Sequence, residues 1–328
     1  MTDSPQFPAQ DDVLDFDDGE PIKYWLNLLL FALTVPSVFF AGALQVDPSI
    51  AGALPHRLLE IWRGWPFAVP LLTILLAHEF GHYIAARIHR VPASLPYFIP
   101  LPALSPFGTM GAIIAMRGRI RSRAALLDIG AAGPIAGMVV ALPVLALGLH
   151  WSTIGPNPTS NYAQEGQSLL YMLMKRVFLG PIPTGMDAQL SPTASAGWVG
   201  FLITMINMLP WGQLDGGHIA FALLGRRQHR IARGIRHFLL VLFGYNLLKF
   251  CVPVALHRSA MTYGFAVGSS LFWFVWYGFT GAIAWISGGA DHPPFEPSEL
   301  DPVRRAVAWS CLVMFVLLFM PTPWVEYP

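Results

Sequence analysis

Charged side chains are scarce in this chain of 328 residues. Lys, Arg, Asp and Glu together make up 12% of it, whereas hydrophobic residues make up 54%. A soluble domain carries about 25% charged residues. Together with a mean hydropathy of +0.52, this deficit excludes a soluble enzyme and predicts a polytopic membrane protein.

Cysteine is also scarce. The chain has only Cys251 and Cys311, and each lies inside an apolar stretch. Two buried-type cysteines do not form the framework of a small secreted fold, and they fall short of a cysteine metal site. We interpret both as small packing residues.

The chain begins without the features of a signal peptide. Residues 1–20 are rich in aspartate and contain little that could form a core, so we expect a disordered acidic cytoplasmic tail there. A basic start followed at once by an apolar stretch is missing. We therefore expect the first span to be retained as an anchor.

Long apolar runs dominate the rest of the chain, residues 21–328, which we interpret as one integral membrane domain. A membrane-spanning helix needs about 20 apolar residues. This criterion predicts an all-α polytopic membrane protein with about seven transmembrane helices. The expected spans are 24–44, 66–87, 125–149, 195–224, 238–257, 263–287 and 304–323.

One apolar stretch cannot be a continuous helix. Residues 91–123 contain five prolines, and proline breaks a helix interior. Gly108 and Gly111 suggest tight turns, and "GAIIAM" (111–116) reads as a short strand. Irregular backbone at membrane depth must be satisfied by protein or by a water-filled cavity. We therefore expect a re-entrant β-hairpin at 93–118. In the long loop 150–194, residues 169–180 are expected to form an amphipathic helix on the membrane surface.

Arginines set the expected orientation. They cluster between the second and third spans and again after the fourth, and the positive-inside rule places both clusters in the cytoplasm. The loop 150–194 and the C-terminus are then outside. Because these arginines flank spans, they do not indicate nucleic-acid binding. The arginines are Arg87, Arg90, Arg117, Arg119, Arg121, Arg123, Arg226, Arg227, Arg230, Arg233 and Arg236.

Ionisable residues interrupt the second span, in "LLTILLAHEFGHYIAAR" (71–87). His78 and His82 are four residues apart, so they project from one face of a helix. Two imidazoles in this arrangement can bind one zinc ion, and Glu79 beside them can serve as a general base. A chance match is disfavoured here because ionisable groups oppose membrane insertion. We expect His89, just past Arg87, to lie at the interface and not to be a ligand.

A third ligand is expected from "NMLPWGQLDGGH" (207–218) in the fourth span, where Asp215 is the only acidic residue. Asp215 lies 11 residues before Arg226, and His78 and His82 lie 9 and 5 before Arg87. At 1.5 Å per residue, these positions are about 16, 13 and 8 Å from the cytoplasmic edge. The three side chains can therefore share one level of the membrane.

The fourth span should break around Asp215. An unwound segment lets Asn207 approach the metal, where it could donate to the substrate or to the oxyanion. Its alternative role is to cap the broken helix. We expect His218 to support the site rather than to be a ligand. The helix-breaking residues are Pro210, Gly212, Gly216 and Gly217.

These two motifs, H-E-F-G-H at 78–82 and N-x-x-P-x-x-x-L-D-G at 207–216, resemble those of the site-2 protease family of intramembrane zinc metalloproteases, peptidase family M50. "FGTMGAIIAM" and "AAGPIAG" are similar to its re-entrant strand region and its middle core helix. The resemblance covers about residues 66–225, and the hairpin wording resembles that of the plastid and cyanobacterial branch.

The resemblance implies that His78, His82 and Asp215 bind zinc and that Glu79 is the general base. Many members carry a PDZ domain after the middle core helix, but the loop here is too short for one. Gly137 stands where the family often has asparagine, so that residue's role does not transfer. Close helix packing is the favoured interpretation of Gly133-x-x-x-Gly137.

We therefore expect a zinc endopeptidase that cuts membrane-spanning protein substrates within or near their transmembrane segments. The expected location is a multi-pass position in a bacterial inner membrane, with the site near the cytoplasmic side. One alternative is a metal-ion transporter, which needs several sites along a pathway. Another is an inactive protease-like scaffold, which would be expected to lose Glu79 or a ligand. The sequence names neither the substrate nor the oligomeric state.

Overall fold

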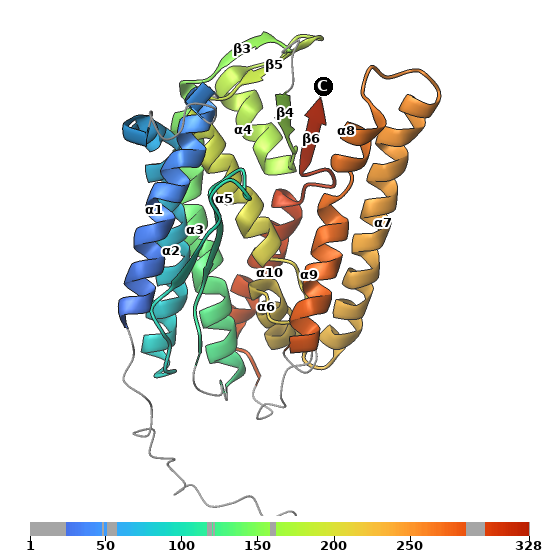
Figure 1. Ribbon diagram of the computed structural model, residues 1–328. Coiled ribbons are helices and arrows are strands. Elements are labelled where there is room, and N and C mark those ends of the chain that lie inside the picture. Colours follow the sequence, from blue (N-terminus) through green and yellow to red (C-terminus); the bar gives the residue numbers. More distant parts are fainter. Residues whose placement is uncertain are drawn as a thin grey trace, which may run out of the picture.

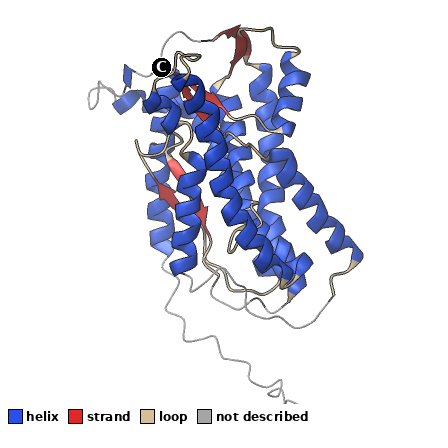
Figure 2. Ribbon diagram, turned by 90° about the vertical axis from the view of Figure 1, so that its right-hand side faces the viewer, coloured by secondary structure: helices blue, strands red, loops and turns tan. Residues whose placement is uncertain are grey.

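A computed structural model describes residues 24–47, 49–50, 58–116, 120, 122–157, 162–286 and 299–327. Most of the helices run along one common direction and form a bundle (Figure 1). Strands lie at one end of this bundle and, separately, in a hairpin beside the helices (Figure 2). The expected acidic tail, 1–20, lies outside the described residues.

Four helices in the described part of the chain are long and apolar enough to cross a membrane. They are α1 (Tyr24–Val46), α2 (Trp65–Ile88), α3 (Arg123–His150) and α7 (Arg227–Ala255). The short 3-10 helix η2 (Leu58–Gly64) leads directly into α2. These helices match four of the expected spans, although α7 begins 11 residues earlier than expected.

The other three expected spans are not single long helices. The fourth is divided into α5 (Pro192–Asn207) and α6 (Asp215–Leu224), and the sixth into α8 (Tyr263–Gly268) and α9 (Phe272–Ile286). The last, α10 (Pro302–Leu318), has 17 residues and is followed by Pro321 and Pro323, which cannot continue a helix. The count of seven spans therefore stays a prediction.

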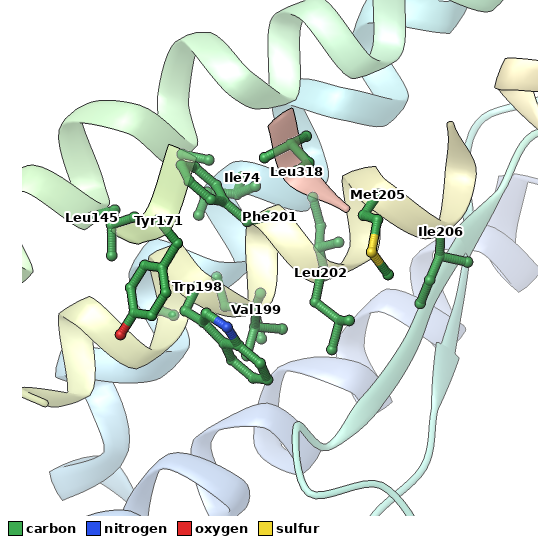
Figure 3. Close-up of a cluster of buried hydrophobic side chains, with 14 of the residues drawn as sticks. Ile74, Leu145, Tyr171, Trp198, Val199, Phe201, Leu202, Met205, Ile206 and Leu318 are labelled. Carbon is green, nitrogen blue, oxygen red and sulfur yellow. The ribbon is translucent and has the colours of Figure 1, made fainter. Parts of the chain in front are cut away.

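Helix α3 is the centre of the bundle and packs against α2, α5, α6 and α10. Small residues allow the close approach: a Cβ on Gly81 of α2 would lie 2.5 Å from the carbonyl oxygen of Ala132 in α3. Large apolar side chains from several helices fill the space between α2, α3 and α5 (Figure 3). They include Ile74, Leu145, Trp198, Phe201 and Leu202.

A β-hairpin lies within the expected segment 93–118, and its re-entrant position in a membrane stays a prediction. Strands β1 (Tyr97–Pro100) and β2 (Thr109–Ile113) are antiparallel, and they lie against α1 and α2. The second strand begins two residues before the predicted "GAIIAM", and an isolated bridge joins Ala93 to Met116 beyond it. Gly108 at the turn has φ of +75°, and its carbonyl accepts a hydrogen bond from Ser37 of α1.

Two further small sheets form the end of the bundle that carries the loop 150–194, and the sequence did not predict them. They pair β3 (Thr153–Pro156) with β5 (Met186–Gln189), and β4 (Tyr162–Glu165) with β6 (Trp324–Tyr327). The expected helix at 169–180 is confirmed as α4 (Leu169–Leu179). Its Lys175 is buried, with Nζ 3.1 Å from both Glu165 Oε1 and Asp187 Oδ1.

The described arginines of the two clusters, which leave out Arg117, Arg119 and Arg121, lie at the same end of the bundle, as predicted. The end of α2, the start of α3 and the junction between α6 and α7 meet there, and we call it the arginine-rich end (Figure 1). The two small sheets, α4 and the last described residues lie at the opposite end. This arrangement agrees with the predicted order of crossings.

Candidate metal and catalytic site

Helix α2 presents His78, Glu79 and His82 toward the interior of the bundle. All three side chains are buried, with residue exposures between 4% and 7%. The four-residue spacing places the imidazoles on one face, and their Nε2 atoms lie 3.2 Å apart. The sequence spacing predicted that His78 and His82 share a helix face, and the structure places their imidazoles in direct contact.

Asp215 reaches the same point from the broken helix. Helix α5 ends at Asn207 and α6 begins at Asp215, so the predicted break is confirmed. Gly212 takes φ of +50° within the connecting turn. The turn packs back onto α6, where a Cβ on Gly216 would lie 2.0 Å from the carbonyl oxygen of Met208. Glycine at this position allows Asp215 to sit at the first turn of α6.

The three donor atoms form a nearly equilateral triangle. Asp215 Oδ2 lies 3.3 Å from the Nε2 atom of His78 and 3.3 Å from that of His82, and the two Nε2 atoms are 3.2 Å apart. Zinc binds nitrogen and oxygen at about 2.0–2.1 Å in tetrahedral geometry, which requires ligand atoms about 3.3–3.4 Å apart. The residues therefore fit one face of a zinc tetrahedron.

A backbone contact selects the tautomer of His82. Its Nδ1 lies 2.7 Å from the carbonyl oxygen of Ile129 in α3. A carbonyl oxygen only accepts, so in the neutral imidazole Nδ1 carries the hydrogen and Nε2 keeps its lone pair for a metal. The sequence could not indicate this contact, since every residue has a carbonyl.

Glycines of α3 form the wall behind the histidines. A Cβ on Gly133 would lie 2.0 Å from His82 Nε2, and one on Gly137 would lie 3.2 Å from His78 Nδ1. A Cβ on Gly130 would meet the Cβ of His218 at 3.1 Å. Close packing was the expected meaning of Gly133 and Gly137, and the structure shows that the packed groups are the site's own imidazoles.

A cavity of about 630 Å³ opens onto this site, and Glu79 lines it together with the three donors. The hairpin forms one wall, and α9, which the sequence did not implicate, forms another. Such a space admits an extended peptide segment beside the donors. Lining residues outside the donor set include Ala112, Ile114, Asn207, His218, Trp276 and Phe279.

The remaining candidates are also placed by the structure. Asn207 Nδ2 lies 3.2 Å from His78 Nε2, so the broken helix does bring Asn207 to the site. His218 lines the cavity but is not part of the donor group found among the described residues. His89 lies away from that group, with its Nε2 2.8 Å from Asp128 Oδ2.

Comparison with known proteins identifies a matching family and several relatives. The family model for peptidase family M50 matches residues 66–249. The protein named "Probable zinc metalloprotease EGY1, chloroplastic" from Arabidopsis thaliana is 34% identical over 225 residues, and its namesake from Oryza sativa subsp. japonica is 32% identical over 226 residues. "Probable zinc metalloprotease EGY2, chloroplastic" from Arabidopsis thaliana is 31% identical over 169 residues, or 50% of this chain and 29% of that protein.

The similarity to the two EGY1 proteins covers 62% of this chain in each case, but only 40% and 38% of their own lengths. No solved structure matches this chain.

Proposed function

The chain belongs to peptidase family M50, as its two motifs predicted, and we propose that it is an intramembrane zinc metalloendopeptidase. It would hydrolyse peptide bonds within or near the transmembrane segments of membrane-anchored proteins. The observation that carries this proposal is the triangle of three buried donor atoms with Glu79 in the same cavity.

His78, His82 and Asp215 would hold the zinc ion. When bound, zinc supplies Lewis-acid chemistry: it lowers the pKa of a water and polarises a carbonyl. The described residues that line the cavity beside the imidazoles and the carboxylate include no Lys or Arg. The donor set therefore provides one negative charge and two neutral nitrogen ligands, a combination suited to zinc.

Glu79 would act first as the general base and then as the general acid. Its carboxylate lies in the cavity next to the donors but does not belong to the donor group. It can accept the proton of the attacking water and return it to the amide nitrogen that leaves. Glu79 is only 5% exposed, and it lines the cavity beside the donors.

Asn207 would stabilise the oxygen on which negative charge develops. Its Nδ2 now faces His78 Nε2 at 3.2 Å. A nitrogen lone pair that is given to a metal cannot also accept a hydrogen bond, so the Asn207 amide then needs another acceptor. The carbonyl oxygen of the bond being cut provides one within the same cavity.

The substrate would bind as an extended strand along the free edge of β2. The Ser94 amide donates to the Ala115 carbonyl, so Ala115 directs its backbone toward the first strand. Backbone groups alternate along a strand, which turns those of Ala112 and Ile114 toward the other edge, and both residues line the cavity. Added strands bind at such edges.

The proposed topology keeps seven crossings and a re-entrant hairpin. The pairs α5–α6 and α8–α9 would each cross as one unit, and α10, with 17 residues, is about 26 Å long. That length nearly spans a hydrocarbon core of about 30 Å.

The curated relatives are named chloroplastic and give no support to a bacterial inner membrane. The proposal therefore places the site in a multi-pass membrane protein near the arginine-rich end.

The transporter alternative has less support. A pathway needs several coordination sites, whereas the described part of the chain holds one group of three or more possible metal ligands, at the cavity.

The test compares three variants of the purified chain in lipid vesicles with a membrane-anchored reporter. Glu79→Gln should abolish cleavage and keep zinc, because Glu79 is not a ligand. His78→Ala and Asp215→Ala should lose both, as measured by elemental analysis and gel electrophoresis. Substantial cleavage by Glu79→Gln, or its loss of metal to the same extent as the ligand variants, would contradict the assignment.

A further inference from the structure

An ionic contact joins three helices close to the site at the arginine-rich end. Arg304, in the first turn of α10, donates from Nε to Asp128 Oδ1 and from Nη2 to Asp128 Oδ2, at 3.0 and 2.7 Å. His89, at the end of α2, lies 2.8 Å from the same Asp128 Oδ2. Asp128 of α3 thereby holds both α2 and α10.

A second contact joins α3 to the helix that carries Asp215. The Arg123 guanidinium donates from Nε and Nη2 to the carbonyl oxygen of Ala222 in α6, at 3.0 and 2.7 Å. Carbonyls in the last turn of a helix lack partners within the helix and favour cations. Asp128 and Arg123 thus tie the first turns of α3 to the ends of α2 and α6.

These contacts lead directly to a proposed metal ligand. Asp128 precedes Ile129, whose carbonyl lies 2.7 Å from His82 Nδ1. A shift of this turn of α3 therefore moves the group that orients His82. Helix α10 also packs behind α6, where Ala308 and Cys311 contact the cluster containing Ile219.

We propose that Arg304, Asp128 and His89 act as a clamp that positions His82 relative to Asp215. They are positioning residues, since none of them belongs to the donor group. The inference rests on the proposed zinc site. It assigns a role to α10, which lies outside the segment matched by the family model, residues 66–249.

The clamp predicts an effect on the metal that is larger than its effect on stability. Arg304 and Asp128 are partly exposed, with side-chain exposures of 36% and 29%. Ion pairs at such positions contribute little to stability. Groups that orient a ligand, in contrast, change metal affinity by about 10- to 100-fold when removed. Loss of a purely structural contact would not lower zinc affinity by more than it lowers stability.

The experiment uses the full chain in lipid nanodiscs and compares Arg304→Gln and Asp128→Asn with a matched control, Arg305→Gln. Arg305 is the next residue and pairs with Glu299, whose side chain is 90% exposed. Zinc affinity is measured by competition with a chelator, ligand geometry by the absorption spectrum of the Co²⁺ form, and stability by thermal unfolding.

We expect Arg304→Gln and Asp128→Asn each to weaken zinc binding about tenfold and to alter the Co²⁺ spectrum, with melting temperatures close to that of the control. The double variant should lose no more than Asp128→Asn alone, because Asp128 is the partner of both Arg304 and His89. Arg304→Lys keeps the charge but not the two-pronged contact, so it should lie between wild type and Arg304→Gln.

Equal zinc affinity and equal Co²⁺ spectra for Arg304→Gln and Arg305→Gln would overturn the clamp. If Arg304→Gln does not fold, Arg304→Lys takes its place in the comparison with the same criterion. A wild-type chain that binds no zinc would instead overturn the proposed function itself, so the two failures are distinguishable.

Discussion

Replacing Gly133 by alanine tests whether the backbone of α3 shapes the metal site. The new Cβ would lie 2.0 Å from His82 Nε2 and 2.4 and 2.5 Å from Cδ2 and Cε1 of that ring. Ordinary contact begins at 3.4 Å, so the ring must retreat by 1.4 Å at Nε2. Zinc sites tolerate about 0.2 Å in ligand distance. The retreat therefore removes His82 from the ligand set.

The fold should survive this change. The atom that must move is the far end of a side chain, and alanine is favoured over glycine inside a helix by about 1 kcal/mol. We expect Gly133→Ala to fold, to lose tight zinc binding and to lose at least about 100-fold in cleavage rate, since a misplacement of 1 Å alone has that effect. Elemental analysis, chelator competition and the reporter assay measure these quantities.

Gly137→Ala is the matched control, one turn further along α3. Its Cβ would lie 3.2 Å from both Cβ and Nδ1 of His78, so a shift of about 0.2 Å restores ordinary contact. This variant should keep its zinc and most of its activity. The reasoning fails if Gly133→Ala binds zinc as tightly as Gly137→Ala does.

Two further predictions concern the hairpin and the orientation. Ile114→Pro removes a backbone donor at the proposed substrate edge and should cripple cleavage with zinc content unchanged, whereas Ile114→Ala keeps the donor and should remain active; equal activity of the two would exclude strand addition there. The orientation test uses a chain whose own two cysteines are replaced by alanine. A cysteine introduced at Ala163 should react with an impermeant thiol reagent applied outside intact cells, whereas one introduced at Arg230 should not. The reverse labelling pattern would invert the orientation.

Local features of the sequence were sufficient for four of the spans and for the two segments that carry the site residues. Helix periodicity places His78 and His82 on one face whatever surrounds them. Proline and glycine between Asn207 and Asp215 break a helix for reasons that lie within the segment itself. Shared depth in the membrane then predicted that Asp215 lies near the histidines, and the 3.3 Å distances agree with that prediction.

Contacts between segments far apart in the chain determine the features that the sequence did not predict. Strand β4 pairs with β6, which lies more than 150 residues away in the sequence. The hydrophobic alternation of a four-residue strand is too short to predict which strand it pairs with. The break explained how Asn207 could approach, but only packing set its 3.2 Å contact with His78.

The sequence by itself determined which residues could bind a metal, because spacing along a helix and insertion cost in a membrane are local properties. Only the tertiary structure decided what holds those residues in place. The Ile129 carbonyl, the Gly133 backbone and the Arg304 side chain act on His82 or its surroundings across contacts between different helices. Backbone groups and glycines look alike at every position of a sequence, so their roles emerge only when helices pack.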